Sequence, residues 1–466
     1  MRILFLTPGS GDQFYCENCL RDKAVLTALR RAGHDALSVP LYLPLLMAAT
    51  RPEKRTGVFF GGLNVFLQQK LAFFRRSPRW LDRLLDAGWL LRILARRAGA
   101  TDAKDLGELT VSMLAGPDGR QGKELDRLVE FLSRTGRGDA IVLSNALLLG
   151  LAGRIRDRVG CPLLCLLQDE HELADALEEP FRQQAWALMR EKIRGVSAVA
   201  ASSRYYADRM AERLAIPRER IHVVYNGVDA GDYAPPAGPP DPPVIGYLTR
   251  MHKDFGLDLL ARAFIRLHQS GRVGPVRLAV SGGQVGADKA FVRSVQRQLE
   301  QARLGDRVDW VSDFDSPGKR AFLARLSVLA VPGRTEAGGG LAVLEALASG
   351  VPVVAPEAGV YPELIAATGG GMLFPPGDEA ALADKLAALL AEPARAWRVA
   401  QAARQVVIQD YSADAAAGHT RTADPPGARR TIDSDDSPSP GAYYATAWNH
   451  GGVCRVRKVA GSDDGE

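Results

Sequence analysis

The sequence predicts an α/β protein made of two doubly wound, Rossmann-like domains that face each other across a cleft. Short apolar runs alternate with segments of helical periodicity in two separate blocks of the chain. A proline-rich segment, residues 237–243, divides the blocks and is typical of an extended linker. With 466 residues, 46% of them hydrophobic, the chain is long enough to form two full cores.

The first domain, residues 1–236, is expected to open with a β–loop–α–β unit. Its first elements are a strand over residues 2–7, a helix over 19–32 and a strand over 36–39. Gly9 and Gly11 follow the first strand and let a ligand approach the backbone closely, so they are candidate binding residues. The same Gly-Ser-Gly sequence also serves any tight turn from strand to helix, and it is not the full G-x-G-x-x-G fingerprint.

Cys16 and Cys19 have the spacing of a metal-binding or redox-active CxxC motif. No second CxxC and no pair of histidines follows, whereas a structural zinc site needs four ligands. A redox role would place the motif at a helix start, which is its expected position. Packing of two small side chains in a loop is the favoured alternative. The five cysteines of the chain are too few and too irregular for a disulfide framework.

Residues 41–134 are expected to form a helical, aromatic-rich insertion in the first domain. Arg75, Arg76 and Arg79 lie among aromatic residues, a combination found in helices that contact membrane surfaces. The favoured alternative is an apolar face packed on the core, with the arginines in solvent.

Further strands of the first domain are expected over residues 140–143, 162–167, 196–201 and 221–224. Glu170 and His171 follow the second of these strands and are candidate substrate-binding groups at the sheet edge. For an isolated histidine near a strand end, a hydrogen-bonded structural role is the commoner alternative.

The second domain, residues 244–412, repeats the alternation. Its strands are expected over residues 244–248, 276–281, 308–311, 328–331 and 351–355, and helices over 257–269 and 319–326. Residues 413–466 are rich in Gly, Pro, Ser and Asp without an apolar period, which predicts a disordered tail.

Residues 335–356 carry the most specific pattern in the chain. Three consecutive glycines open an amphipathic helix, and such a helix start exposes backbone N–H groups that suit a diphosphate. A carboxylate one turn into the helix suits the vicinal hydroxyls of a ribose, and one before the glycines can reach a sugar. The candidate ligands are therefore Glu336, Gly338, Gly339, Gly340, Leu341 and Glu345. Together they predict a nucleotide-sugar site.

This stretch resembles the Glu-x7-Glu signature of retaining, family 4 glycosyltransferases, which have the GT-B fold. The resemblance implies that Glu336 approaches the hydroxyls of the donor sugar and that Glu345 holds the ribose. The glycine-loop amides would meet sugar and phosphate. Eight residues rather than seven separate the two glutamates, and one extra residue adds at most about 3.6 Å of chain. The N-terminal segment and residues 61–70 are similar to one bacterial branch of these transferases.

In that family an arginine and, five residues later, a lysine clamp the diphosphate. Arg250 matches the arginine, Phe255 stands at the lysine position, and Lys253 lies two residues earlier. The sequence leaves open whether Lys253 reaches the diphosphate. The resemblance also implies that Val311 lies near the nucleobase. From their places at the sheet edge, Gly9 and Gly11 are candidate donor-binding residues, and Glu170 and His171 are candidate acceptor-side residues.

We therefore expect a hexosyltransferase-type enzyme that moves a sugar from a nucleotide-sugar donor to an acceptor hydroxyl with retention of configuration. No cofactor and no metal are expected, since no Asp-x-Asp is placed as single-domain transferases place it. One alternative is a GT-B nucleotide-sugar epimerase. Another is a catalytically impaired relative that only binds the donor. The extra glycine favours this second alternative, as do Phe255, a Ser144-Asn145 pair where many relatives have histidine, and the lack of a recognisable final helix crossing back to the first domain.

The net charge of +5 permits an anionic substrate or a membrane surface and does not argue for nucleic acid. The N-terminus lacks the features of a signal peptide, and no apolar run reaches the roughly 18 residues of a transmembrane helix. A cytoplasmic protein is expected, with peripheral contact at the inner face of the membrane as an option. The acceptor would be a saccharide, a lipid-linked molecule or another small molecule.

Overall fold

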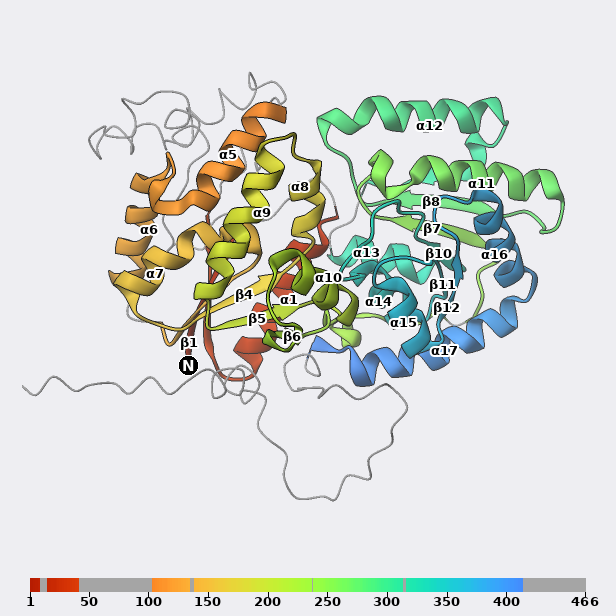
Figure 1. Ribbon diagram of the computed structural model, residues 1–466. Helices are drawn as coiled ribbons and strands as arrows, with labels where there is room; N and C mark the ends of the chain where they lie inside the picture. The colour runs from red at the N-terminus through yellow and green to blue at the C-terminus, as the bar shows by residue number, and fades with distance from the viewer. Residues whose placement is uncertain (9–14, 42–102, 135–137, 237, 313–315, 414–466) are drawn as a thin grey trace, which may run out of the picture.

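The computed structural model describes residues 1–8, 15–41, 103–134, 138–236, 238–312 and 316–413. In these residues the chain forms two lobes, each built on a six-stranded parallel sheet with flanking helices (Figure 1). The expected fold class, two Rossmann-like domains, is confirmed. The last strand of the first sheet ends at Val223 and the first strand of the second begins at Val244, so the proline-rich segment lies between the sheets.

The first lobe has the strand order β2-β1-β3-β4-β5-β6. Its strands are β1 (Arg2–Thr7), β2 (Asp35–Pro40), β3 (Ala140–Leu143), β4 (Leu163–Leu167), β5 (Ala198–Ala201) and β6 (Ile221–Val223). Its helices are α1 (Glu17–Arg31), α5 (Ala103–Ala115), α6 (Gly122–Arg134), α7 (Ala152–Val159), α8 (Glu170–Ala176), α9 (Phe181–Lys192) and α10 (Arg204–Leu214).

The second lobe has the strand order β12-β11-β10-β7-β8-β9. Its strands are β7 (Val244–Leu248), β8 (Arg277–Ser281), β9 (Val308–Trp310), β10 (Val328–Ala330), β11 (Val353–Pro356) and β12 (Gly371–Phe374). Its helices are α11 (Leu257–Ser270), α12 (Lys289–Gln301), α13 (Ser316–Ala324), α14 (Leu341–Ala348), α15 (Tyr361–Thr368), α16 (Glu379–Ala391) and α17 (Pro393–Asp410).

The apolar pattern of each element explains its place. All five residues of β4 are buried, as expected for a parallel strand covered on both faces. Helix α11 buries Leu257, Leu260, Phe264 and Leu267, which recur at the helical period and form the stripe that faces the sheet. Each lobe therefore has its own hydrophobic core.

The expected helical insertion is only partly within the described residues. Helices α5 and α6 belong to it, and they pack beside α9 and α7 (Figure 1). Residues 42–102, with Arg75, Arg76 and Arg79, lie outside the described part of the chain. Among the helices that are described, none combines the length and the apolarity needed to cross a bilayer.

No final helix was expected to cross back to the first lobe; a final helix is present, and the chain returns to the first lobe through the residues that follow it. Helix α17 packs on α14 and α15, and after its end the chain forms a parallel bridge between Val228 and Ser412. Ala413 then packs against Ala28 of α1. Arg404 of α17 also donates a hydrogen bond to the carbonyl oxygen of Tyr233, at 3.1 Å. The predicted tail beyond residue 413 lies outside the described residues.

Candidate nucleotide-sugar site between the lobes

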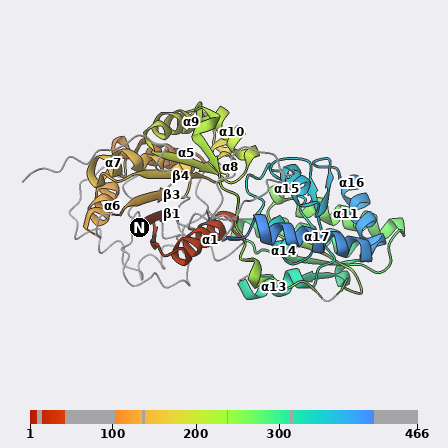
Figure 2. The same ribbon diagram turned by 90° about the horizontal axis from the view of Figure 1, so that it is seen from below.

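A cavity of about 230 Å³ lies where the two lobes meet. Figure 2 shows α1 of the first lobe reaching toward α14 of the second, and the two helices are in contact. The residues of the first lobe that line the cavity are Tyr15, Cys16, Glu17, Asn18, Asp169 and Glu172. The second-lobe residues that line it include Thr249, Arg250, Phe255, Thr335, Ala337 and Ala342. The cavity therefore sits at the carboxyl ends of both sheets, as the sequence predicted for the ligand site.

The first N–H groups of α14 are hydrogen-bonded to a carboxyl group of the first lobe. Leu341 and Ala342 donate their backbone N–H groups to the two oxygens of Glu17, at 3.1 and 3.2 Å. Gly340 caps the helix at φ +62°, and a Cβ there would come within 3 Å of Leu364 and Val360. The glycine is therefore required by both conformation and space. This helix start already binds the two oxygens of a carboxyl group in the cleft, and the same N–H groups suit the oxygens of a phosphate.

The other two glycines of the loop contact the first lobe. The N–H of Gly338 donates to Asp169 at 2.7 Å, and its carbonyl oxygen accepts from the hydroxyls of Ser202 and Ser203. A Cβ on Gly339 would lie 2.5 Å from the side chain of Asn226. The glycine loop is thus seated between the lobes, and Gly338 already uses its N–H and its carbonyl oxygen.

Glu345 is buried, with 3% of its surface exposed, and it does not line the cavity. It accepts hydrogen bonds from the hydroxyls of Tyr15 (2.6 Å) and Tyr233 (2.8 Å) and forms an ion pair with Lys319. The Lys319 ammonium also lies 5.5 Å from the centre of the Tyr15 ring. The predicted ribose acceptor is therefore engaged by three donors, at positions 15, 233 and 319. Sequence spacing could not reveal these long-range partners.

Glu336 is turned toward the first lobe. Its carboxylate forms an ion pair with Arg209 and accepts a hydrogen bond from the hydroxyl of Tyr205 at 2.8 Å. The side chain is 48% exposed and, unlike its neighbours Thr335 and Ala337, does not line the cavity. In this arrangement the glutamate predicted to reach the donor sugar points away from the cavity.

Arg250 is the predicted cation that lines the cavity. Both oxygens of Asp288 accept hydrogen bonds from its guanidinium, which fixes the orientation of the side chain. Lys253 lies in a short 3-10 turn, is exposed and does not line the cavity, whereas Phe255 forms part of the wall. Lys253 therefore does not occupy the place that the family's lysine would take.

Three carboxylates of the first lobe surround the cavity, and the sequence did not single them out. Burial, reinforced by the negative charge of Asp169, raises the pKa of both Glu17 and Glu172 to about 7. Burial also raises the pKa of Asp169 itself. The signal for Glu17 was its place between two cysteines at a helix start, and the signal for the other two was the polar sequence after β4.

Glu170 and His171, the predicted acceptor-side residues, are buried beside the cavity rather than in its wall. Glu170 accepts from the N–H groups of Ala146 and Gln168 and from the hydroxyl of Tyr206. His171 lies 3.2 Å from the same hydroxyl, and burial lowers its pKa to about 4. Both residues have structural partners, and their neighbours Asp169 and Glu172 face the cavity instead.

The remaining predicted residues are placed as follows. Val311 donates its N–H to the carbonyl oxygen of Val280 and packs in a core cluster, and it does not line the cavity. Gly9 and Gly11 lie outside the described residues. In the described ranges, no three His, Cys, Asp or Glu side chains are grouped so that they could hold a metal ion.

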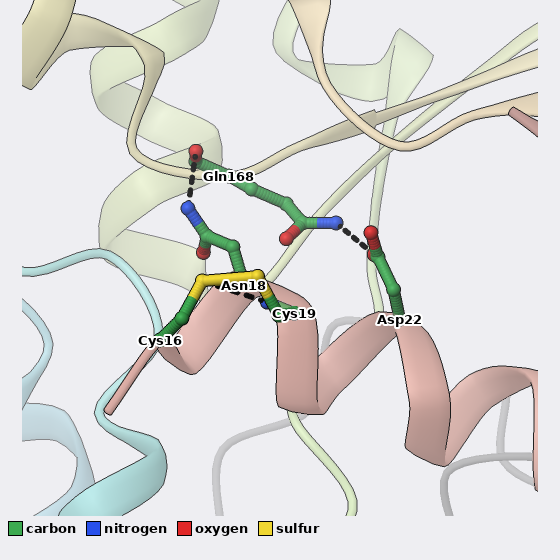
Figure 3. Close-up of a disulfide and its surroundings, with 5 residues drawn as sticks. All are labelled: Cys16, Asn18, Cys19, Asp22 and Gln168. Atoms are coloured by element: carbon green, nitrogen blue, oxygen red, sulfur yellow. Dashed lines mark hydrogen bonds between the residues drawn. A yellow bond between two sulfur atoms is a disulfide. The ribbon is translucent and has the colours of Figure 1, made fainter. Parts of the chain in front are cut away.

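Cys16 and Cys19 are joined by a disulfide at the start of α1 (Figure 3). The favoured expectation of two small side chains packed in a loop is therefore wrong. Asn18, between them, donates from its side chain to the carbonyl oxygen of Gln168 at 3.2 Å, and Gln168 donates to Asp22 at 2.7 Å. These contacts fix the first turn of α1 to the end of β4.

Two family models match successive parts of the chain. Residues 23–227 match the model described as "Glycosyl transferase 4-like domain", and residues 234–406 match "Glycosyl transferases group 1". The chain is 28% identical over 375 residues to the D-inositol 3-phosphate glycosyltransferase of Xylanimonas cellulosilytica, covering 74% of this chain and 87% of that protein. It is 33% identical over 214 residues to the lipopolysaccharide core mannosyltransferase LpcC of Rhizobium leguminosarum, covering 44% of this chain and 57% of that protein.

Solved structures with the same fold include the sucrose-phosphate synthase of Thermosynechococcus elongatus, with a TM-score of 0.65 and 18% identity. That match covers 89% of this chain and 96% of the synthase chain. HepE of Anabaena in complex with UDP and glucose gives a TM-score of 0.62 at 18% identity, over 89% of this chain and 97% of that chain. At this identity the structures establish the fold. The chain therefore has the fold of these structures, and its two lobes are similar in turn to the 4-like and the group 1 glycosyltransferase domains.

Proposed function

We propose that the protein transfers a sugar from a nucleotide-sugar donor to an acceptor hydroxyl, with retention of the anomeric configuration. The observation that carries the proposal is the carboxylate of Glu17 on the N–H groups of Leu341 and Ala342. It marks a helix start, in the cleft, whose N–H groups bind the two oxygens of an acidic group. Ala342 and Arg250 line the same cavity, so a diphosphate placed there would meet amide dipoles and a fixed guanidinium.

The charge that develops on the departing diphosphate would be stabilised by Arg250 and the amides of α14. Both are oriented before the reaction, Arg250 by Asp288 and the amides by the helix. The acceptor hydroxyl would attack from the face that the diphosphate leaves, and a phosphate oxygen would accept its proton. Closure of the lobes would exclude water and limit hydrolysis of the donor. This chemistry uses no metal and no cofactor besides the donor.

The relatives include a mannosyltransferase, which supports a hexose as the transferred group, and a D-inositol 3-phosphate glycosyltransferase, which supports a polyol acceptor. HepE structures with UDP and UDP-glucose support a nucleotide-sugar donor. We place the reaction on a saccharide, lipid-linked or small polyol acceptor in the cytoplasm, with peripheral contact at the membrane. A role in cell-envelope or polysaccharide synthesis fits these relatives.

A second candidate is a protein that binds the donor without transferring its sugar. It is favoured by the ion pair that holds Glu336 on Arg209 and by the burial of Glu345 under Tyr15. The two candidates make the same prediction for binding and opposite predictions for product formation.

The test begins with calorimetry against UDP-glucose, GDP-mannose and ADP-glucose, because a bound donor identifies the nucleotide. Transfer is then measured by NMR of the anomeric proton, with saccharide and inositol phosphate acceptors. Arg250→Ala should slow turnover about 100-fold, as expected when a preorganised charge is removed. Arg272→Ala, at an exposed arginine of the same lobe, is the matched control and should leave turnover unchanged. Binding without any transfer would favour the second candidate, and a new sugar nucleotide formed without acceptor would reveal an epimerase.

A further inference from the structure

The short segment Tyr15–Cys16–Glu17 belongs to the first lobe but is bound to the second. The N–H of Tyr15 donates to the carbonyl oxygen of Gly282 at 2.6 Å, and its hydroxyl donates to Glu345. Glu17 accepts from the first two amides of α14. The segment therefore places a hydroxyl on the predicted ribose acceptor and a carboxylate on the predicted diphosphate seat, which are the two contacts expected of a nucleotide diphosphate.

The other end of this segment is fixed to the first lobe. Cys19 lies in the first turn of α1, and Asn18 is hydrogen-bonded to the end of β4 (Figure 3). The disulfide joins Cys16, on the side of this attachment that contacts the second lobe, to Cys19, on the side held by the first lobe, with the Cα atoms 5.4 Å apart. The bridge thus closes a ring that contains Glu17 and holds it in the first turn of the helix.

We propose that Cys16–Cys19 is a redox-active site. Its disulfide form keeps Tyr15 on Glu345 and Glu17 on the first amides of α14, where the donor would bind, and its dithiol form releases them. This proposal rests on the proposed function, since it is the transferase activity that responds to the thiol–disulfide balance. With the bridge intact, Glu17 can leave α14 only if the first turn of α1 moves with it. Without the bridge, Cys16 and Glu17 can unwind from the helix while Cys19 stays in place.

The chemistry requires a dithiol reductant from solution. One of its thiolates attacks a cysteine sulfur and breaks the S–S bond, forming a mixed disulfide. Its second thiol then displaces the protein sulfur, so the protein gains two electrons and two protons and the reductant becomes a disulfide. Both cysteines are partly exposed, and Cys16 lines the cavity, which gives a reductant access. A CxxC pair at a helix start is a setting in which thiolates are stabilised.

The experiment compares the oxidised and reduced full-length protein. Thiol titration in denaturant should find all five cysteines in the reduced protein and three in the oxidised one. Hydrogen exchange of a peptide that begins several residues before Leu341 and ends at Ala348 should show faster exchange of the Leu341 and Ala342 amides after reduction. Calorimetry with the nucleotide sugar that binds should give a dissociation constant about tenfold lower in the reduced state, because the seat no longer has to be vacated.

Two double variants provide the controls. Cys16→Ser with Cys19→Ser should reproduce the reduced state whatever the redox buffer. Cys161→Ser with Cys165→Ser removes the same number of cysteines from a buried part of the first lobe and should keep the redox response. Equal exchange at the two amides in both states overturns the proposal, even if no donor binds and the proposed function fails. Equal affinities for a donor that does bind also overturn it.

Discussion

Both carboxylate oxygens of Asp288 accept hydrogen bonds from the guanidinium of Arg250, at 2.9 Å from Nε and 3.0 Å from Nη2. The Asp288 side chain is fully buried. Burial alone would raise its pKa, but the hydrogen bonds from Arg250 and from the N–H of Val285 outweigh it and lower the pKa. Asp288 is therefore a charged positioning group for the one predicted cation that lines the cavity.

Asp288→Asn should lower turnover about tenfold, because one charge-assisted hydrogen bond to Arg250 is lost. The asparagine can still accept the N–H of Val285, so the fold should persist. The measurement is kcat at saturating donor, with the unfolding midpoint as a check on folding. Asp384→Asn breaks an exposed pair with Arg272 and should leave kcat unchanged. An unchanged kcat in Asp288→Asn would remove the positioning role.

Lys319→Met should lower the free energy of unfolding by about 3–5 kcal/mol, because it leaves Glu345 buried without its cation. Urea unfolding in a fixed redox buffer measures the loss. Replacing both partners, as in Lys319→Met with Glu345→Leu, should recover much of it, since no buried charge then remains. A loss below about 1 kcal/mol in the single variant, the value of an exposed pair, would contradict the burial of this pair.

Stability should depend on pH through Asp22, which is buried and accepts a hydrogen bond from Gln168. Burial raises its pKa from 3.8 to about 7. Between these values the folded protein keeps a proton that the unfolded chain releases, so the unfolding free energy falls as pH rises through that window. Asp22→Asn removes this pH dependence, because asparagine does not titrate.

The unfolding free energy of the variant minus that of the wild type should therefore rise by roughly 2–4 kcal/mol between about pH 4 and about pH 7. Above about pH 7 this difference should stay constant. Urea unfolding across this range gives the difference directly, and the other titrating groups cancel in it. A difference that stays constant with pH would show that Asp22 is charged in the folded protein throughout.

If Glu336 has to leave Arg209 to reach the sugar, Arg209→Ala should lower the KM for the donor by about two- to fivefold. This factor corresponds to the free energy of a partly exposed ion pair. Glu336→Gln should raise KM or lower kcat, because the sugar loses a charged acceptor. Initial rates at varied donor concentration measure both. Parallel changes in the two variants would show that the pair acts as a unit and that Glu336 has no separate role.

The fold could be largely predicted because short buried strands and amphipathic helices leave a local trace. The expected strands over residues 140–143 and 244–248 coincide with β3 and β7. Strand β12 was missed because it is short, begins with a glycine and is only partly buried. The return of the chain to Val228 was missed because a single bridge after a helix leaves no periodic pattern.

The site could be predicted in location but not in detail. Glycines and a helix start are local features, so the helix start at Leu341, which suits a diphosphate, could be predicted from the sequence. The partners of Glu345 come from positions 15, 233 and 319, and no spacing rule links them. The position of Glu336 depends on Arg209 in the other lobe. Which carboxylate faces the cavity after β4 depends on the turn into α8, where Asp169 has a left-handed backbone.

Two segments of the chain lie side by side between the lobes: the segment that leads into the linker and the end of α17 with the residues after it. The Val228–Ser412 bridge and the hydrogen bond from Arg404 to the carbonyl oxygen of Tyr233 join these two segments. A single connection would let one lobe swing about several directions. Two connections that share hydrogen bonds confine the motion to rotation about one axis through them. A substrate that draws the lobes together then arrests one degree of freedom instead of several, so less of its binding energy is lost to entropy.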